Sequence, residues 1–509
     1  MTRFPPLALG LAMPVALFST AAFADLTPAQ VWGDWRTYLE GMGYQISATE
    51  SVSGDDLTVS DISLNFQMPE DGSMNMTLGT IRFDQNRDGT VAIILPDTMP
   101  ITMSGKDSGP GGEEFAMTLN YSQTGHAMTA SGSPEEMTYL YTAQTIAMDL
   151  VQMQVGNEAL GEDMARVKVA GSNLETTTTL SIGDMREYTQ SGSLDSLTYD
   201  FSFIDPEQPN TQGAVTGSVT GVTMNGAGII PLDVPDAGDM AAMLEAGFDV
   251  SGGFSYTGGS SNFDMKDPES GNYVMSTSSD GGELSVDMGA DGLAYAGAQK
   301  NVNVAVTAEG MPFPFEIAMA ESGFNLAMPV SKSDEAQDFA FGLTLGSFTM
   351  SDMIWSMFDP AGQLPRDPAT VVLDLAGKAK LLVDWMNPDA AAQMAGAPGE
   401  VEALQLNTLV VDAAGAKLEG SGDLTFDGAG PSMVPGMGNP VGDVNLTLDG
   451  GNGLLDKLVA MGLLPQDQAM GARMMMGLFA VPGTEPDSLK SRIEFTQDGQ
   501  ILANGQRIR

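Results

Sequence analysis

The segment LTVSDISLNFQMPEDGSMNMTLGTIRF, residues 57–83, alternates apolar and polar side chains, turns at residues 69–72, and alternates again. Such alternation is typical of strands in an antiparallel sheet that has one apolar and one polar face. The phase of the alternation changes at Asp61 and again near Gly79. Each change predicts a bulge or a bend, because an extra residue in one strand shifts the side chains that follow it.

Similar strand patterns recur through the chain, and most are bounded by Gly, Asp, Asn or Ser. They include residues 219–224, 404–406, 424–426, 444–448 and 493–495. A faint internal repeat accompanies them, since SGSPEEMTYLY begins at Ser131 and SGSLDSLTYDF begins at Ser191. We interpret each copy as a turn that leads into a strand, so the repeated unit would be a hairpin.

A helix is predicted before these strands, in LTPAQVWGDWRTYLEGMGY at residues 26–44. Thr27 fits an N-cap and Pro28 fits the first helical position. One face of this helix carries Val31, Trp35, Tyr38 and Leu39, and the helix can end at Gly41 or Gly43. Further helices are expected at residues 235–247, from residue 351 onward, and as a helical hairpin at residues 454–461 and 466–479.

These patterns predict an elongated α+β protein that is mainly β, with large curved antiparallel sheets and a few packed helices. We divide the chain after its first 24 residues into three regions. Residues 25–230 form an N-terminal helix and sheet region, residues 231–330 a middle β region with a short helix, and residues 331–509 a C-terminal β region with the helical hairpin. The boundaries are soft and allow one continuous body, because no long Gly/Ser or charged linker separates the regions.

Residues 1–24 have the pattern of a secretory signal peptide. Arg3 is the only charge before Asp25, and the apolar run at residues 7–18 is too short to span a bilayer. A small-x-small site follows at residues 22–24, so we expect cleavage after Ala24. The mature chain is then exported and periplasmic, with no transmembrane segment; the alternative is a retained membrane anchor.

The charge balance excludes several partners. The chain has 21 Lys and Arg against 66 Asp and Glu, a formal net charge of −45. Such a surface repels nucleic acid and anionic lipid headgroups, so we expect no nucleic-acid partner. The chain also has no cysteine, which leaves no disulfide and no thiolate metal site.

No constellation of residues predicts a reaction. His126 is the only histidine and has no nucleophile motif beside it, so we expect an ordinary structural residue. The stretch DQNRDGT at residues 84–90 imitates the first half of a calcium loop, but Leu95 stands where that loop needs a bidentate Glu. A hairpin turn explains the same residues through its own Asp, Asn and Gly.

Methionines and carboxylates are the remaining candidates. The 36 methionines, among them Met74, Met76 and the run 474–476, could offer thioethers to copper(I). They are better explained as flexible core filling, or as the lining of an adaptable apolar groove. Five acids gather around Arg366, where we expect a structural ion pair rather than a catalytic site; they are Asp352, Asp359, Asp367, Asp374 and Asp384. We therefore expect no catalytic residue, no cofactor-binding residue and no metal ligand.

Three stretches carry a resemblance to a known family: TPAQVWGDWRTYLEGMGYQI, LTVSDISL and FDPAGQLPRDPATVVLDLAG. They resemble a bacterial family of unknown function, number 2125 (DUF2125), seen in alphaproteobacteria, over the whole mature chain. The resemblance implies a Gram-negative periplasmic setting and assigns no functional residues. The C-terminal strands and the helical hairpin are also weakly similar to AsmA- and YdgA-type envelope proteins, which are repetitive β proteins.

The leading functional hypothesis is a non-enzymatic periplasmic protein of the cell envelope. It could bind lipid-like or other apolar ligands along a groove of the sheet, or contact other envelope proteins. An acidic protein-interaction module is the alternative, and an Asp/Glu-dependent hydrolase is a more remote one. The deciding question is whether the apolar sheet face is an open groove or a closed core.

Overall fold

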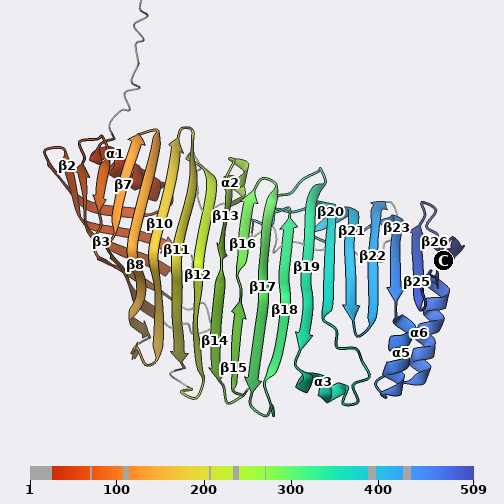
Figure 1. Cartoon of the computed structure of the whole chain (residues 1–509). Coiled ribbons are helices and arrows are strands. Elements are labelled where there is room, and N and C mark those ends of the chain that lie inside the picture. Colours follow the sequence, from red (N-terminus) through yellow and green to blue (C-terminus); the bar gives the residue numbers. More distant parts are fainter. Residues whose placement is uncertain are drawn as a thin grey trace, which may run out of the picture.

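The computed structural model describes residues 26–68, 72–106, 114–156, 158–205, 208–232, 240–269, 271–387, 397–427 and 437–508. Its strands form one long antiparallel sheet with a few helices, and the N-terminal end of the sheet curls over (Figure 1). The predicted fold, mainly β with few helices, is therefore confirmed. The described helices are α1 (Pro28–Gly41), α2 (Met240–Glu245), α3 (Asp352–Phe358), α5 (Gly451–Ala460) and α6 (Gln466–Phe479).

The strands follow one another across the sheet nearly in chain order. The first group is β1 (Gln45–Ser53), β2 (Asp56–Met68), β3 (Gly72–Gln85), β4 (Val91–Ile94), β5 (Thr98–Lys106), β6 (Glu114–Thr124), β7 (Ala127–Ser133), β8 (Glu136–Val155), β9 (Glu158–Leu160), β10 (Ala165–Ile182), β11 (Met185–Ile204) and β12 (Gln212–Pro231). The second is β13 (Asp249–Tyr256), β14 (Gly258–Lys266), β15 (Tyr273–Ser279), β16 (Gly282–Gly289), β17 (Gly292–Ala308) and β18 (Phe315–Met328). The third is β19 (Gln337–Met350), β20 (Ala369–Leu381), β21 (Gly399–Ala413), β22 (Ala416–Asp427), β23 (Asn439–Asp449), β24 (Val481–Pro482), β25 (Ser488–Phe495), β26 (Ile501–Ala503) and β27 (Gln506–Arg507).

The sheet is a meander in which two successive strand positions are each occupied by two half-length strands. Both β13 and β14 pair with β12, and β16 and β15 in turn pair with them and with β17. Long strands such as β11 and β12 pair along almost their whole length. The three predicted regions thus contribute strands to one hydrogen-bonded sheet, through β12 to β14 and β18 to β19.

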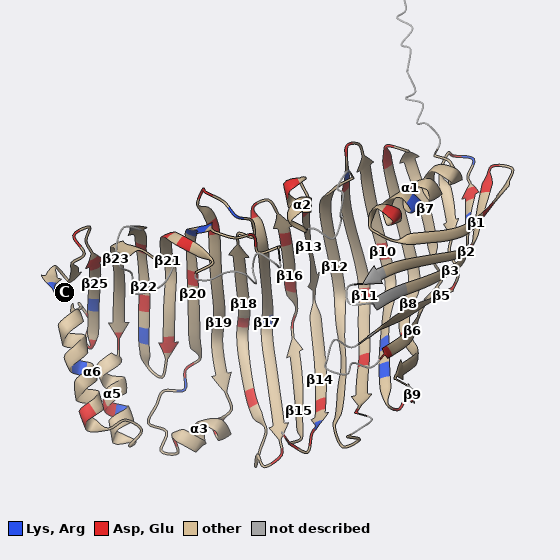
Figure 2. Ribbon diagram, turned by 180° about the vertical axis from the view of Figure 1, so that it is seen from behind, with Lys and Arg blue, Asp and Glu red and all other residues tan. Residues whose placement is uncertain are grey.

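A closed hydrophobic core exists at the N-terminal end. There α1 lies between β2 to β4 on one side and β7, β8 and β10 on the other, on the face that Figure 2 presents. Thr27 caps α1 and Pro28 opens it, as predicted, and the helix ends at Gly41. Trp35 packs edge-on against Phe83, with ring centroids 5.6 Å apart. The predicted packing of this helix on a sheet is confirmed.

Bulges explain the phase changes of the opening segment. Asp61 has φ 54° and lies at a shift in the pairing of β2 with β3, and Gly79 has φ 68°. Val59 and Ile62, on either side of the first bulge, are both fully buried in the same core. Each inserted residue therefore keeps the apolar side chains on one face, although the sequence parity changes.

The other predicted elements have mixed outcomes. The helix after Ser351 and the C-terminal helical hairpin are confirmed as α3, α5 and α6. Of the helix predicted at 235–247, residues 240–245 are helical, and residues 233–239 lie outside the described part of the chain. Residues 69–71 of the turn predicted at 69–72 also lie outside the described part. The repeat interpretation is wrong for its second copy, because Ser191 and the residues after it lie inside the continuous strand β11.

Candidate functional site: the open apolar face

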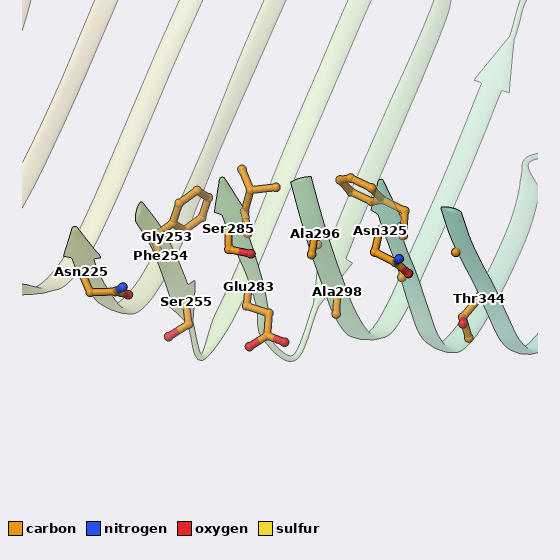
Figure 3. A pocket seen from close by; sticks show the side chains of 15 residues that line it. Asn225, Gly253, Phe254, Ser255, Glu283, Ser285, Ala296, Ala298, Asn325 and Thr344 are labelled. Atoms are coloured by element: carbon orange, nitrogen blue, oxygen red, sulfur yellow. The ribbon is translucent and has the colours of Figure 1, made fainter. Parts of the chain in front are cut away.

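The register of the strands defines two chemically different faces. We call "apolar face" the side that carries Met224, Phe254, Leu284, Phe324 and Leu343, which stand side by side in one row across the sheet, joined through Gly297. Because successive side chains of a strand point to opposite sides, their neighbours form the "polar face". That face carries Asn225, Ser255, Glu283, Asn325 and Thr344, and Figure 3 shows Phe254 pointing away from Ser255 and Glu283.

The row continues through the C-terminal strands. Leu343 pairs with Leu373, and Leu373 pairs with Leu409. A parallel row beside it consists of Val286, Tyr295, Leu326, Phe341, Leu375 and Leu406. From β12 to β23, the Asp, Glu, Lys and Arg residues within these pairings fall on the polar face. Within these pairings, the apolar face is thus free of charge over this length.

The apolar face is open beyond the N-terminal core. Phe324 is 47% exposed and Phe254 is 43% exposed, and Tyr295, Leu326 and Phe341 are exposed as well. The buried apolar side chains of the described residues after 250 are few: Val302, Val330, Ile354, Leu364, Leu381, Ala416, Ala469 and Ala503. No second layer of described elements therefore closes over the rows. The apolar face of the sheet is thus a closed core at its N-terminal end and is open to solvent along the rest of its length.

A second apolar patch lies on the other half of the same strands. Phe201, Val215 and Phe263 form one row there, and a small cavity of about 210 Å³ opens beside them. Tyr256 and Val219 both lie within 3.2 Å of the Cβ position at Gly259, which places the two halves on the same face. Between the halves, Gln299 donates to the Tyr256 hydroxyl, which is 3.0 Å from the Ser279 hydroxyl. These groups satisfy one another and form a polar strip across the face.

His126 takes a structural position. Its Nε2 lies 3.1 Å from the carbonyl oxygen of Leu95, and its Nδ1 lies 3.8 Å from an Asp97 carboxylate oxygen. The side chain is largely buried between strands, and the described contacts bring no Ser, Thr or Lys nucleophile to it. These contacts fit the interpretation of His126 as an ordinary structural residue.

The calcium-like stretch forms the turn between β3 and β4. The Asp88 carboxylate accepts from the backbone N–H and the hydroxyl of Thr90, and Asn86 also donates to that hydroxyl. Asp84 is paired with Arg82, and Gly89 has the positive φ that the turn requires. The polar groups of Asn86, Asp88 and Thr90 are therefore hydrogen-bonded within the turn.

The five acids around Arg366 do not converge. Arg366 pairs with Asp352 at 2.6 Å, which is an ion pair of the predicted structural kind. Asp359 is fully buried and accepts from the N–H groups of Gln363 and Leu364; its burial raises the carboxyl pKa, but these bonds outweigh it and hold the pKa below its usual value. Within the described residues, no group of three or more His, Asp or Glu side chains could hold a metal ion.

The methionines serve different roles along the chain. Met76 packs partly buried against the N-terminal core, whereas Met474 and Met475 are largely exposed on α6. Successive residues of a helix point about 100° apart, so the run at 474–476 does not gather its sulfur atoms on one ligand. Met224 stands in the main row of the apolar face, where its flexible side chain suits an adaptable surface.

None of the aromatic residues of the apolar face was predicted from the sequence as a site residue. Phe254, Tyr295 and Phe324 each alternate with small or polar residues, which is the available signal for a strand with one apolar face. That signal does not tell an open face from a packed one. The ion pair between Asp34 on α1 and Arg186 on β11 was also not foreseen, since 152 residues separate its partners.

Comparisons with known proteins do not assign the chain to a family. No protein-family model matches it, and no curated protein matches it. Among solved structures, the ferric preacinetobactin receptor BauA from Acinetobacter baumannii matches with 9% identity over 91% of this chain and 78% of that chain. The TM-score is 0.13, so the two folds do not superpose and this likeness carries no functional argument. Among the described residues, no helix combines the length and the apolar character needed to cross a membrane.

Proposed function

We propose that this chain is a non-enzymatic, periplasmic protein of the cell envelope that holds lipid-like ligands on its apolar face. The observation that carries the proposal is that this face is both open and free of charge. Exposed aromatic and aliphatic rows are costly in water, and a ligand that covers them gains about 25 cal/mol for each Å² of apolar area removed from solvent.

The dimensions of the face favour an elongated apolar ligand. Neighbouring strands lie about 4.8 Å apart, so the row from Met224 to Leu409 extends over roughly 35 Å. A hydrocarbon chain laid along such a row contacts side chains alone and leaves no backbone group unsatisfied. The aromatic rings at Phe254 and Phe324 supply large contact areas for it.

The compartment belongs to the same proposal. The signal-peptide pattern at residues 1–24 suits an exported chain. The resemblance to the alphaproteobacterial family of unknown function, and the weaker one to AsmA- and YdgA-type proteins, suit an envelope role. An exported protein with an open apolar face could hold a lipid that water would otherwise exclude.

Native mass spectrometry after gentle purification, with lipid extraction, tests the proposal, together with titration of a fluorescent fatty-acid probe. Phe324→Asp places a charge in the centre of the apolar face, and we expect it to weaken probe binding at least about tenfold. Asn325→Asp, on the polar face of the same strand, is the matched control and should bind like the unsubstituted protein. Absence of co-purified lipid together with no probe uptake would refute the proposal.

The polar face favours a second candidate function, an acidic protein-interaction module. It has a hollow of about 550 Å³ lined by Asn225, Ser255 and Glu283 among other residues, and the acids of the strands stand on this side. A cationic partner would be held by charge, which salt screens. Cross-linked pull-downs at low and high salt should then differ, and identical partner lists would remove this candidate.

A further inference from the structure

A cavity of about 490 Å³ lies where the closed core meets the open apolar face. Trp35, Tyr38 and Leu39 of α1 form one wall of this cavity, which we call the "α1 cavity". The opposite wall comes from strands β7, β8, β10, β11 and β12 and includes Met128, Tyr139, Leu180, Tyr188 and Ile230. Its lining is mostly aromatic and aliphatic, and it stands on the same face as the apolar rows.

The one ionised group in the lining is compensated. Arg186 donates to both carboxylate oxygens of Asp34, at 2.6 and 2.9 Å, and both side chains are about 8% exposed. The guanidinium also lies over the ring of Tyr38, 4.4 Å from its centroid. Burial raises the pKa of the Tyr188 phenol, and the neighbouring Tyr38 raises it further. The Tyr188 side chain in this wall therefore stays neutral. An apolar group can therefore enter without meeting an unpaired charge.

Glycines connect the α1 cavity to the rows of the apolar face. Gln190 in the cavity wall pairs with Gly226, Gly226 pairs with Gly252, and Gly252 pairs with Val286 in the open row. A side chain added at Gly252 would meet its nearest atom only at 3.5 Å, and one added at Gly226 at 3.6 Å. Two neighbouring strands thus leave a channel without side chains between the cavity and Val286, which in turn pairs with Tyr295.

We propose that the α1 cavity binds the apolar end of a fatty-acyl chain that crosses Gly226 and Gly252 and lies along the open rows. This inference rests on the proposed function and adds the direction of the ligand. The closed core behind Trp35 stops the chain, so its methyl end lies against α1. The charged or polar head then points toward the middle of the sheet, where the face is open to water.

Tryptophan quenching tests the direction of binding in the whole protein. A fatty acid brominated near its methyl end should quench Trp35 more strongly than one brominated near its carboxyl group. The Trp35→Phe variant identifies the contribution of Trp35, because the other three tryptophans, Trp32, Trp355 and Trp385, remain in it. Stronger quenching by the carboxyl-end probe, or equal quenching in Trp35→Phe and the unsubstituted protein, would overturn the inference.

Gly252→Leu tests the channel, and the open space at this position lets the variant fold. We expect it to lose most of the Trp35 quenching while the fluorescent fatty-acid probe still binds the rest of the face. Gly323→Leu is the matched control, because its Cβ position is equally open but lies on the polar face. Full quenching in Gly252→Leu would refute the channel. Failure of every probe to bind would instead refute the proposed function itself.

Discussion

Asparagine stabilises the irregular points of the long strands. Asn173 and Asn301 have φ of 52° and 48°, a conformation that most side chains avoid but asparagine tolerates. Each also donates through Nδ2 to a nearby carboxylate: Asn173 to Asp195 of β11 at 2.7 Å, and Asn301 to Asp280 in the turn between β15 and β16 at 3.0 Å. Single residues of this kind let the strands bend without losing the division into two faces.

We expect Asn301→Val to destabilise the protein by about 1–2 kcal/mol, because a β-branched side chain is strained at this φ and cannot donate to Asp280. Asn301→Gly keeps the backbone conformation and should cost less. Asn262→Val, at an exposed and regular strand position, is the control and should be nearly neutral. Denaturant unfolding measures all three; equal losses in the two valine variants would contradict this role of Asn301.

At the scale of elements, the helix α5 depends on a residue far along the chain. Its N-cap is Gly450, which has no side chain to satisfy the first N–H groups. Asp487 does so instead, accepting from the N–H of Gly453 at 2.8 Å and of Asn452 at 3.1 Å. Burial raises the pKa of the Asp487 carboxyl, but these bonds and the nearby Arg473 outweigh it and lower the pKa below its ordinary value of 3.8.

Asp487→Asn should therefore lower stability at pH 7 by about 1 kcal/mol, because a neutral acceptor is weaker than a carboxylate at a helix N-terminus. A lowered folded-state pKa stabilises the fold above the ordinary value of 3.8, and the effect is lost as the pH falls through the folded-state value. The difference in melting temperature between the two proteins should accordingly shrink below pH 4. A constant difference from pH 7 to pH 3 would contradict this, and Asp498→Asn, in an exposed turn, is the control.

At the scale of the whole molecule, stability is distributed unevenly. The fully buried side chains gather around α1, whereas strands β13 to β18 have an exposed apolar face. Regions with few buried contacts open locally at lower free energy. We expect amide hydrogen exchange to be slowest in β2, β3 and β8 and faster in β13 to β18.

A saturating fatty acid should slow exchange in β13 to β18, because the open face gains contacts, and should leave β2 and β3, which do not line the α1 cavity, nearly unchanged. Uniform protection across the sheet without ligand would contradict the division into a closed end and an open length. Mass spectrometry of peptic peptides resolves these segments.

The sequence predicted the strands, the capped helix α1 and the C-terminal helical hairpin, because alternation and capping residues act over a few neighbours. It did not place the second copy of the repeat, at Ser191, inside a strand. The same residues are compatible with a turn or with a bulged strand, and hydrogen-bonded pairing with β10 and β12 makes them a strand. The rows of the apolar face could not be predicted from the sequence either, since each row combines residues from strands far apart in the chain.

By itself, the sequence determined that the strands have one apolar and one polar side, because alternation fixes on which side each residue stands. It also determined the acidity of the chain and its lack of cysteine chemistry. Only the tertiary structure decided that α1 closes the apolar face at one end and that no described element covers the rest. The physical reason is that alternation records how a strand divides its side chains, whereas burial depends on which distant segment packs over them.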